Sequence, residues 1–326
     1  MTWDRIRAAK EKFEKLLMGK AHVIGVGVGK KVVAGEETDE PAVIVFVEKK
    51  LPEPKLKRKD RIPKTLDEVK TDVIETGRLK AQALIAGGRA RTDRWRPAPG
   101  GVSVGHIRIT AGTLGGVVRA GGRRVILSNN HVLGASNAAR IGDPILQPGP
   151  ADSGTRDDAI ATLERFVEIR FEDPGAAGWG FLGWLRRLAE RLGLRRAAAP
   201  PQNLVDAAIA TPLGEDLVAD SILELDRSPG IAEAGVGDRV RKSGRTTGVT
   251  EGKILATDAT VEVDYDRSVA TFTDQLVAGP MSQGGDSGSL LLNDQGRAVG
   301  LLFAGSDRTT VFNRASRVAE ALGIEF

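Results

Sequence analysis

The chain of 326 residues contains no cysteine, which excludes disulfide bonds and thiolate metal sites. It also lacks any apolar run long enough to span a bilayer. Its first residues, MTWDRIRAAKEKFEKLLMGK, are charged throughout and lack the apolar segment of a secretory signal. These absences favour a soluble, cytoplasmic protein that needs no oxidising compartment, and no membrane partner is expected.

Aromatic residues are scarce, at 4% of the chain, whereas its 40 glycines suit many short strands joined by tight turns. The formal charge of +4 comes from interleaved basic and acidic residues, so no nucleic acid partner is expected. There are three histidines, His22, His106 and His131, so any catalytic imidazole must be one of them. They form no H-E-x-x-H motif or carboxylate cluster, so no metal or other cofactor is expected.

Residues 1–97 are predicted to form a small α+β domain. Apolar residues recur at helical spacing near the start, at Ile6, Ala9, Phe13, Leu16 and Leu17. The runs AHVIGVGVGKKVV (21–33) and PAVIVFVEK (41–49) then predict strands. The alternating glycines of the first run fail the phosphate-loop pattern and indicate close packing instead. The stretch RTDRWRPAPGG (91–101) is typical of a linker.

Residues 98–326 are predicted to be mainly β, because short apolar runs alternate with turn signals over a length that suits two barrels. The run RASRVAEALGI (314–324) predicts a closing helix. An insertion at about 172–202 has apolar residues at amphipathic helical spacing, at Phe181, Trp184, Leu185, Leu188 and Leu192. Its partner stays open between the protein's own barrel, another subunit and an anionic membrane surface.

The segment SQGGDSGSLLL (282–292) places a hydroxyl and a carboxylate between glycines. A serine becomes a strong nucleophile only where a base removes its proton and backbone donors receive the oxyanion. The small residues allow a turn in which the N–H groups of Gly285 and Ser287 converge. Ser287 is therefore the candidate nucleophile, with those two amides as the oxyanion hole.

The base and its orienting carboxylate come from two earlier segments. RRVILSNNHVLG (123–134) places His131 just after an apolar strand, and NLVDAAIATP (203–212) places Asp206 among apolar neighbours. Asp158 is a rival for Asp206, because it too precedes an apolar alternation. The order His131, Asp206, Ser287 is that of chymotrypsin-like double barrels, and no histidine follows Ser287 to allow the α/β-hydrolase order.

These motifs carry a resemblance to known families. Residues 102–315 resemble trypsin/chymotrypsin-type serine proteases, and VRKSGRTTGVTEGKI (240–254) followed by MSQGGDSGSLLL (281–292) is similar to the bacterial α-lytic protease branch. The N-terminal runs VIGVGVGKKVVAGEETDEPAVIVFVEKKLP and RIPKTLDEVKTDVIE are similar to the domain that precedes the protease in plant narrow-leaf-type serine proteases and bacterial relatives. The resemblance implies a chymotrypsin-like double β-barrel after a small α+β domain, serine endopeptidase activity on proteins or peptides, and homo-oligomers.

The resemblance also assigns residues. It favours Asp206 over Asp158 as the triad carboxylate, because the family's aspartate begins a strand after the intervening segment. It implies that Asp286 is buried and paired with a basic residue, either Lys242 or Arg245. No proteolytic maturation is then needed.

The substrate pocket is implied at Met281 and Ser282, with walls at Ala304, Gly305 and Ser306. Because Met281 stands where trypsin has its acidic floor, an apolar P1 side chain is expected. Arg241 and Glu251 stand where the α-lytic branch pairs two cysteines, and we predict a cross-strand ion pair between them.

Two other hypotheses remain open. The chain could be an oligomeric binding or scaffold protein on a protease fold, with its catalytic residues out of register. It could also be a protease held inactive by its N-terminal domain or by the insertion at 172–202.

Overall fold

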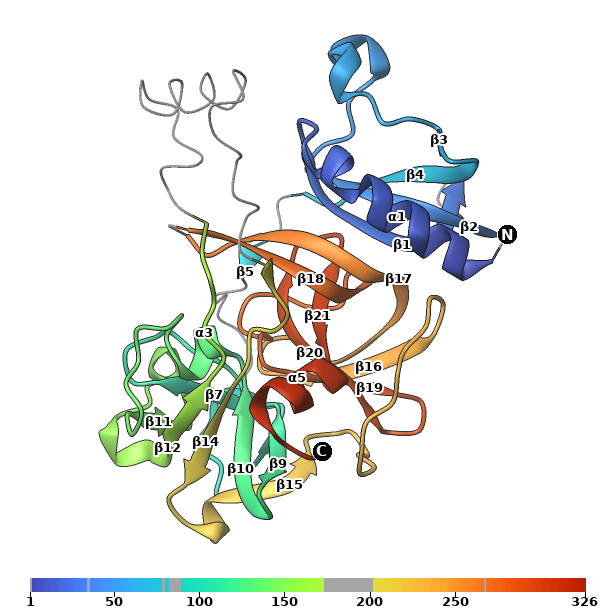
Figure 1. Ribbon diagram of the computed structural model, residues 1–326. Coiled ribbons are helices and arrows are strands. Elements are labelled where there is room, and N and C mark those ends of the chain that lie inside the picture. Colours follow the sequence, from blue (N-terminus) through green and yellow to red (C-terminus); the bar gives the residue numbers. More distant parts are fainter. Residues whose placement is uncertain (1, 34–35, 78–79, 82–88, 173–201, 267) are drawn as a thin grey trace, which may run out of the picture.

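The protein is mainly β, and its computed structural model contains two β-barrel units preceded by a small α+β unit (Figure 1). The predicted chymotrypsin-like double barrel with an N-terminal α+β unit is thus confirmed. The structure describes residues 2–33, 36–77, 80–81, 89–172, 202–266 and 268–326.

In the N-terminal unit one helix packs across a small sheet. The elements are α1 (Trp3–Met18), β1 (Val23–Val33), β2 (Glu36–Val47), β3 (Thr65–Leu66), β4 (Val69–Glu75), β5 (Lys80–Ala81) and the 3-10 turns Glu53–Lys55 and Arg58–Asp60. Helix α1 buries Ile6, Ala9 and Leu17 against valines of β1 and β2. This confirms the helix and the two strands predicted from apolar spacing.

The N-terminal sheet continues into the second barrel, because β1 pairs antiparallel with β17 (Gly248–Asp264). Gly25 lies opposite Val261, and Gly29 lies opposite Ala256. A Cβ on Gly29 would collide with the backbone oxygen of Leu255. The alternating glycines therefore allow the close strand contact that their spacing predicts, and the division into 1–97 and 98–326 remains a prediction.

The first barrel is a seven-stranded sheet in the order β8-β7-β11-β12-β14-β10-β9. Its two end strands, β8 and β9, follow each other along the chain, which brings the edges of the sheet together. The strands are β7 (Ser103–His106), β8 (Gly112–Thr113), β9 (Gly116–Ala120), β10 (Arg123–Ser128), β11 (Pro144–Leu146), β12 (Ala159–Phe166) and β14 (Ala208–Pro212). The one-turn helix α3 (Asn130–Leu133) follows β10, and the 3-10 turns Pro150–Asp152, Arg156–Asp158 and Glu215–Leu217 lie in loops.

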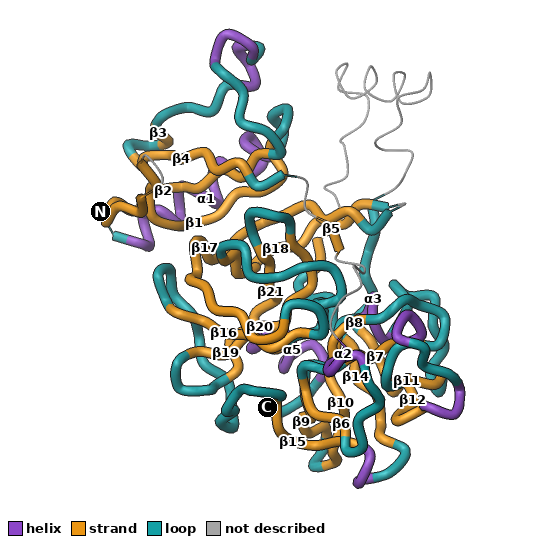
Figure 2. Tube along the Cα trace, turned by 180° about the vertical axis from the view of Figure 1, so that it is seen from behind, coloured by secondary structure: helices purple, strands orange, loops and turns teal. Residues whose placement is uncertain are grey.

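The second barrel closes completely, since the pairings run β16-β17-β18-β21-β20-β19 and return to β16 (Figure 2). Its remaining elements are β13 (Gln202–Asn203), β16 (Arg239–Gly244), β18 (Val269–Ala278), β19 (Leu290–Asn293), β20 (Ala298–Gly305), β21 (Thr310–Arg314) and α5 (Ala315–Leu322). Helix α5 is the predicted closing helix. It packs Val318 and Leu322 with residues of both barrels, including Leu127 and Leu301.

The predicted linker at 91–101 is instead packed structure. It begins within α2 (Arg89–Thr92), where Arg91 is buried and its Nη1 donates to Ser243 Oγ at 2.6 Å. It ends in β6 (Ala98–Gly100), which pairs with β15 (Val218–Ile222). Composition misses this packing, because a distant strand supplies the partners.

The amphipathic helix predicted at 172–202 lies outside the described residues, apart from Glu172 and Gln202. Within the part of the chain that the structure describes, no helix combines the length and apolarity needed to cross a membrane.

Candidate functional site

His131 is held at the end of an apolar strand of the first barrel. Val125, Ile126 and Leu127 of β10 are buried, and the chain then turns into α3. Asn129, just before the turn, donates from Nδ2 to the backbone oxygen of Asp206 at 2.7 Å. The segment that carries the imidazole is therefore tied to the segment that carries the candidate carboxylate.

Asp206 orients the His131 ring. Its Oδ2 lies 2.5 Å from His131 Nδ1, and its Oδ1 accepts the His131 backbone N–H at 3.1 Å. The Asp206 side chain is fully buried, whereas 12% of the His131 side chain is exposed. A carboxylate can only accept here, so Nδ1 carries the proton and Nε2 is left as an acceptor. That buried Nε2 has no hydrogen-bond partner among the described residues.

Sequence reasoning missed Tyr265, which lies beside this pair. Its hydroxyl donates to Asp206 Oδ2 at 2.8 Å, and its ring meets the His131 ring edge-on at 6.0 Å between centroids. Burial and the negative charge of Asp206 raise the pKa of Tyr265 well above its ordinary value. The available signal was weak: Tyr265 is the chain's single tyrosine, in a turn between two strands.

Ser287 lies in a tight loop between two glycines in left-handed conformations. Gly285 has φ +93° and Gly288 has φ +97°, and a Cβ on Gly288 would collide with Ser128. Ser287 is fully buried, and its Oγ donates a long hydrogen bond of 3.5 Å to the backbone oxygen of Phe303. No hydrogen bond joins this hydroxyl to Nε2 of His131.

The backbone N–H of Gly285, one of the two expected oxyanion donors, is left free by the described residues to bind a ligand. Gly285 is buried, and its N–H donates to no residue that the structure describes. Buried backbone N–H groups are nearly always paired, so one without a partner is a candidate ligand donor. The loop is fixed from the first barrel, since Thr113 Oγ1 donates to Gly285 O at 2.8 Å and Thr113 N–H donates to Ser287 O at 2.7 Å.

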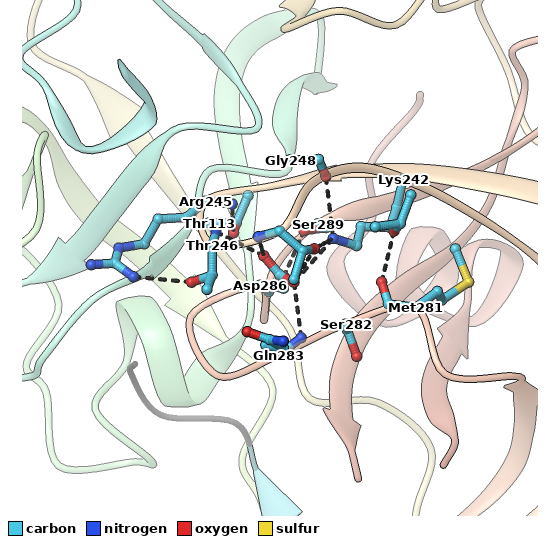
Figure 3. Close-up of polar contacts among 12 residues, drawn as sticks. Thr113, Lys242, Arg245, Thr246, Gly248, Met281, Ser282, Gln283, Asp286 and Ser289 are labelled. Carbon is cyan, nitrogen blue, oxygen red and sulfur yellow. Dashed lines mark hydrogen bonds and ion pairs between the residues drawn. The ribbon is translucent and has the colours of Figure 1, made fainter. Parts of the chain in front are cut away.

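The Asp286 side chain lies in a dense polar network (Figure 3). Its Oδ2 lies 3.0 Å from Lys242 Nζ, and both side chains are fully buried. Further hydrogen bonds come from the backbone N–H groups of Thr246, Thr247 and Gln283 and from the Thr247 hydroxyl. Burial lowers the pKa of Lys242, and the carboxylate of Asp286 opposes that shift.

Of the two basic partners expected for Asp286, the structure thus brings Lys242 to it. Arg245 pairs instead with Asp152 of the first barrel, with 2.6 Å between Nε and Oδ2. Arg245 therefore helps to join the two barrels beside the Ser287 loop.

The predicted pocket residues lie in two segments of the second barrel, a loop before Ser287 and the end of β20. Met281 packs into the barrel core, and the Ser282 hydroxyl lies 2.9 Å from Thr310 Oγ1. Ala304 and Gly305 are buried at the end of β20, and Ser306 Oγ donates to the backbone oxygen of Thr76 at 2.5 Å. The apolar P1 preference remains a prediction that hydrolysis of a small peptide panel would test.

Arg241 and Glu251 lie directly opposite each other on β16 and β17. No ion pair forms between them, however, and Arg241 Nε has no hydrogen-bond partner among the described residues. The predicted ion pair is wrong. Glu251 is exposed, so hydration of its carboxylate competes with a contact that would contribute little.

The other candidates have ordinary structural roles. Asp158 caps a 3-10 turn with Thr155 and pairs with Arg94. His106 is buried with both ring nitrogens bonded, one to Asp143 and one to the Arg108 N–H. Within the described ranges no three His, Asp or Glu side chains gather as metal ligands. The candidate site therefore offers a hydroxyl, an imidazole and a carboxylate, those of Ser287, His131 and Asp206.

Comparisons with protein families link the two ends of the chain to one plant protein. Residues 4–74 match the model of the NARROW LEAF 1 N-terminal domain, and residues 218–320 match that of the Nal1 C-terminal domain. The chain is similar to Protein NARROW LEAF 1 of Oryza sativa subsp. japonica, at 25% identity over 322 residues, 87% of this chain and 51% of that protein. It therefore spans about half the length of this curated relative.

Among solved structures, the chain is similar to a glutamic acid specific serine protease at 18% identity and TM-score 0.46, covering 70% of this chain and 99% of that one. It is similar to Nocardiopsis protease at 16% identity and TM-score 0.45, with coverages of 70% and 97%. It is also similar to α-lytic protease homolog N4 at 17% identity and TM-score 0.45, with coverages of 70% and 98%. The fold assignment rests on the strand pairings above and not on these similarities.

Proposed function

We propose that this chain is a serine endopeptidase that works through His131, Asp206 and Ser287. Ser287 Oγ attacks the scissile carbonyl carbon while His131 Nε2 takes the hydroxyl proton. The backbone N–H groups of Gly285 and Ser287 receive the oxyanion. His131 then protonates the leaving amine, an acyl-enzyme remains, and water, deprotonated by His131, releases the acid.

The observation that carries this proposal is the contrast between two histidines. His106 is a satisfied structural histidine, with both ring nitrogens bonded. His131 has its Nδ1 fixed by a buried carboxylate, while its buried Nε2 has no partner among the described residues. A buried polar atom without a partner calls for an explanation, and the role of a base for the Ser287 hydroxyl proton supplies one.

The proposed mechanism requires Ser287 Oγ to come within hydrogen-bond distance of His131 Nε2. The Ser287 hydroxyl makes a long contact with Phe303 O, at the weak end of hydrogen-bond geometry, and is not hydrogen-bonded to His131 Nε2. Catalytic hydrogen bonds are often long without substrate and tighten in the complex. We therefore propose that the hydroxyl turns towards Nε2 when a peptide carbonyl enters the oxyanion hole.

A fluorophosphonate probe tests the proposal, because it forms a covalent bond only with an activated serine. The wild type is expected to gain one phosphonyl group, and Ser287→Ala is expected to gain none. Ser289→Ala is the matched control, since Ser289 is equally buried but its hydroxyl donates to Asp286 O. Labelling of Ser287→Ala would contradict the assignment. Light scattering on the same samples tests the expected homo-oligomer.

A second candidate, a protease held latent by its N-terminal region, is favoured by one strand pairing. Strand β19 pairs with β20 only as far as Leu301, and β5 then pairs antiparallel with Ala304 and Gly305. The neighbouring Phe303 carries the oxygen that Ser287 contacts. An extended peptide that reaches Ser287 along β20 would need the backbone positions that Lys80 and Ala81 occupy.

Proline substitution tests this latency in the full chain. One of two consecutive residues in an antiparallel strand donates to its partner, so Lys80→Pro/Ala81→Pro removes that donor. Faster fluorophosphonate labelling is expected in this variant, whereas Lys80→Ser/Ala81→Ser keeps both amides and should label like the wild type. Equal rates in all three proteins would contradict latency. No labelling in any of them would favour the binding or scaffold protein instead.

A further inference from the structure

The Asp206 carboxylate is fully buried, so each of its oxygens needs donors. His131 supplies two, through its backbone N–H at 3.1 Å and its ring Nδ1 at 2.5 Å. The third is the Tyr265 hydroxyl at 2.8 Å. Among the described residues, Tyr265 is the single donor to this carboxylate that does not belong to His131. The orientation of Asp206 therefore depends on His131 itself and on one outside group.

Tyr265 reaches Asp206 from the opposite barrel. It follows the last residue of β17, and its N–H donates to Ser268 O at 2.8 Å in the turn before β18. Asp206 lies just ahead of β14 in the first barrel. The hydroxyl thus spans the junction between the barrels at the point where the carboxylate must be fixed.

The tyrosine ring also restricts the imidazole. It meets the His131 ring edge-on, with centroids 6.0 Å apart and planes at 72°, and it meets Phe171 in the same way at 5.4 Å. Edge-to-face contacts of this kind are favourable and directional. One side chain therefore touches both members of the pair, the carboxylate through its oxygen and the imidazole through its ring.

We propose that Tyr265 is a positioning residue for the His131–Asp206 pair. Its hydroxyl bonds the same oxygen, Oδ2, that accepts the imidazole Nδ1 proton. This fixes the oxygen in line with Nδ1 and so keeps Nε2 directed towards the incoming serine proton. The inference rests on the proposed endopeptidase function for its kinetic consequence, but the geometry it asserts exists without catalysis.

The hydroxyl is a donor at neutral pH. Burial, followed by the charge of Asp206, raises the pKa of Tyr265 well above its ordinary value, so the phenol keeps its proton there. A neutral donor also leaves the negative charge of Asp206 intact, which is the charge that must stabilise the imidazolium.

Tyr265→Phe tests the proposal, because it removes one oxygen and keeps the ring. The turnover number on a peptide substrate is expected to fall about tenfold with KM unchanged, since a hydrogen bond to a charged group is lost. The His131 Nδ1 proton resonance is expected to move upfield and broaden. Thr271→Val is the matched control, as it removes a hydroxyl from the same hairpin that donates to Glu172 at 2.7 Å. It should change neither readout.

The outcomes separate this inference from the proposed function. An unchanged turnover and an unchanged Nδ1 resonance in Tyr265→Phe would overturn the positioning role. Equal losses in Tyr265→Phe and Thr271→Val would also overturn it, since they would reveal only a role in hairpin stability. If the wild type neither cleaves peptides nor labels, the proposed function fails, and the Nδ1 resonance still decides whether Tyr265 positions the pair.

Discussion

Two buried aspartates, Asp206 and Asp286, flank the candidate site, and they have opposite surroundings. Asp286, beside Ser287 in the second barrel, is paired with the ammonium of Lys242 and with backbone N–H groups. Asp206, ahead of the first-barrel strand β14, has an imidazole and a phenol as side-chain donors. Both side chains are fully buried. The ammonium of Lys242 neutralises the charge of Asp286, while the charge of Asp206 is left to act on a group that can take up a proton.

The difference indicates what each aspartate does. A fixed cation and several amides make Asp286 a structural anchor that shapes the loop from Gly285 to Gly288. Neutral donors leave the charge of Asp206 available to stabilise a protonated His131. The residue type is the same, so the partners decide between a role in stability and a role in chemistry.

The largest expected effect on stability comes from removing the cation that pairs with Asp286. Lys242→Met leaves Asp286 without its cation and should lower the free energy of unfolding by about 3–5 kcal/mol, the usual cost of breaking a buried ion pair. Urea denaturation measures this loss. Arg241→Met removes the neighbouring cation on β16, whose Nε has no hydrogen-bond partner in the described part of the chain, and should change stability by less than about 0.5 kcal/mol. Similar losses in both variants would contradict the anchoring role of Lys242.

A third carboxylate, Glu262 on β17, sharpens the comparison because its neighbour is another acid. Burial, and then the charge of Glu172, raise the pKa of Glu262 to about 7. Below the ordinary glutamate pKa, Glu262 is neutral in both the folded and the unfolded protein, so it does not change the free energy of unfolding. As the pH rises towards 7, the Glu262 carboxyl ionises in the unfolded chain but stays protonated in the folded protein. The free energy of unfolding therefore falls with rising pH.

Glu262→Gln should therefore stabilise the protein at pH 8 by roughly 2 kcal/mol, after allowance for partial exposure. At pH 4.5, close to the ordinary glutamate pKa, this gain should shrink to less than about 0.5 kcal/mol. A variant whose gain in stability is equal at both pH values would contradict this account.

The smallest expected effect comes from removing a hydroxyl that donates to Asp286, the counterpart of the one that donates to Asp206. Thr247 donates to Asp286 Oδ2 at 2.6 Å, just as Tyr265 donates to Asp206. Thr247→Val should lower the free energy of unfolding by about 1.5 kcal/mol and leave fluorophosphonate labelling of the remaining folded protein unchanged. A variant that keeps full stability but labels slowly would show that Asp286 takes part in the chemistry, and the comparison would fail.

Local sequence patterns predict the parts of the site that depend on short segments. The GDSG turn, the strand before His131 and the alternating glycines of β1 each carry their information within a dozen residues. The sequence narrows the basic partner of Asp286 to Lys242 or Arg245, because both lie in VRKSGR. The structure selects Lys242. The fold class follows from the same short periodic runs.

The rest depends on contacts between distant segments. Tyr265 lies 59 positions from Asp206 and has no motif around it. The predicted linker at 91–101 is packed because Ser243 and β15 supply its partners. The pairing of β5 with β20 joins residues more than 200 positions apart. A single sequence gives no signal for such pairings, since each local segment is compatible with many partners.

The central claim is that Asp206 makes His131 a base for Ser287, and the phosphonylation rate of Asp206→Asn tests it most directly. The rate constant at Ser287 should fall by about 10⁴, because an amide favours the wrong imidazole tautomer, while the thermal midpoint stays close to that of the wild type. Labelling of Asp206→Asn at the wild-type rate would contradict the claim.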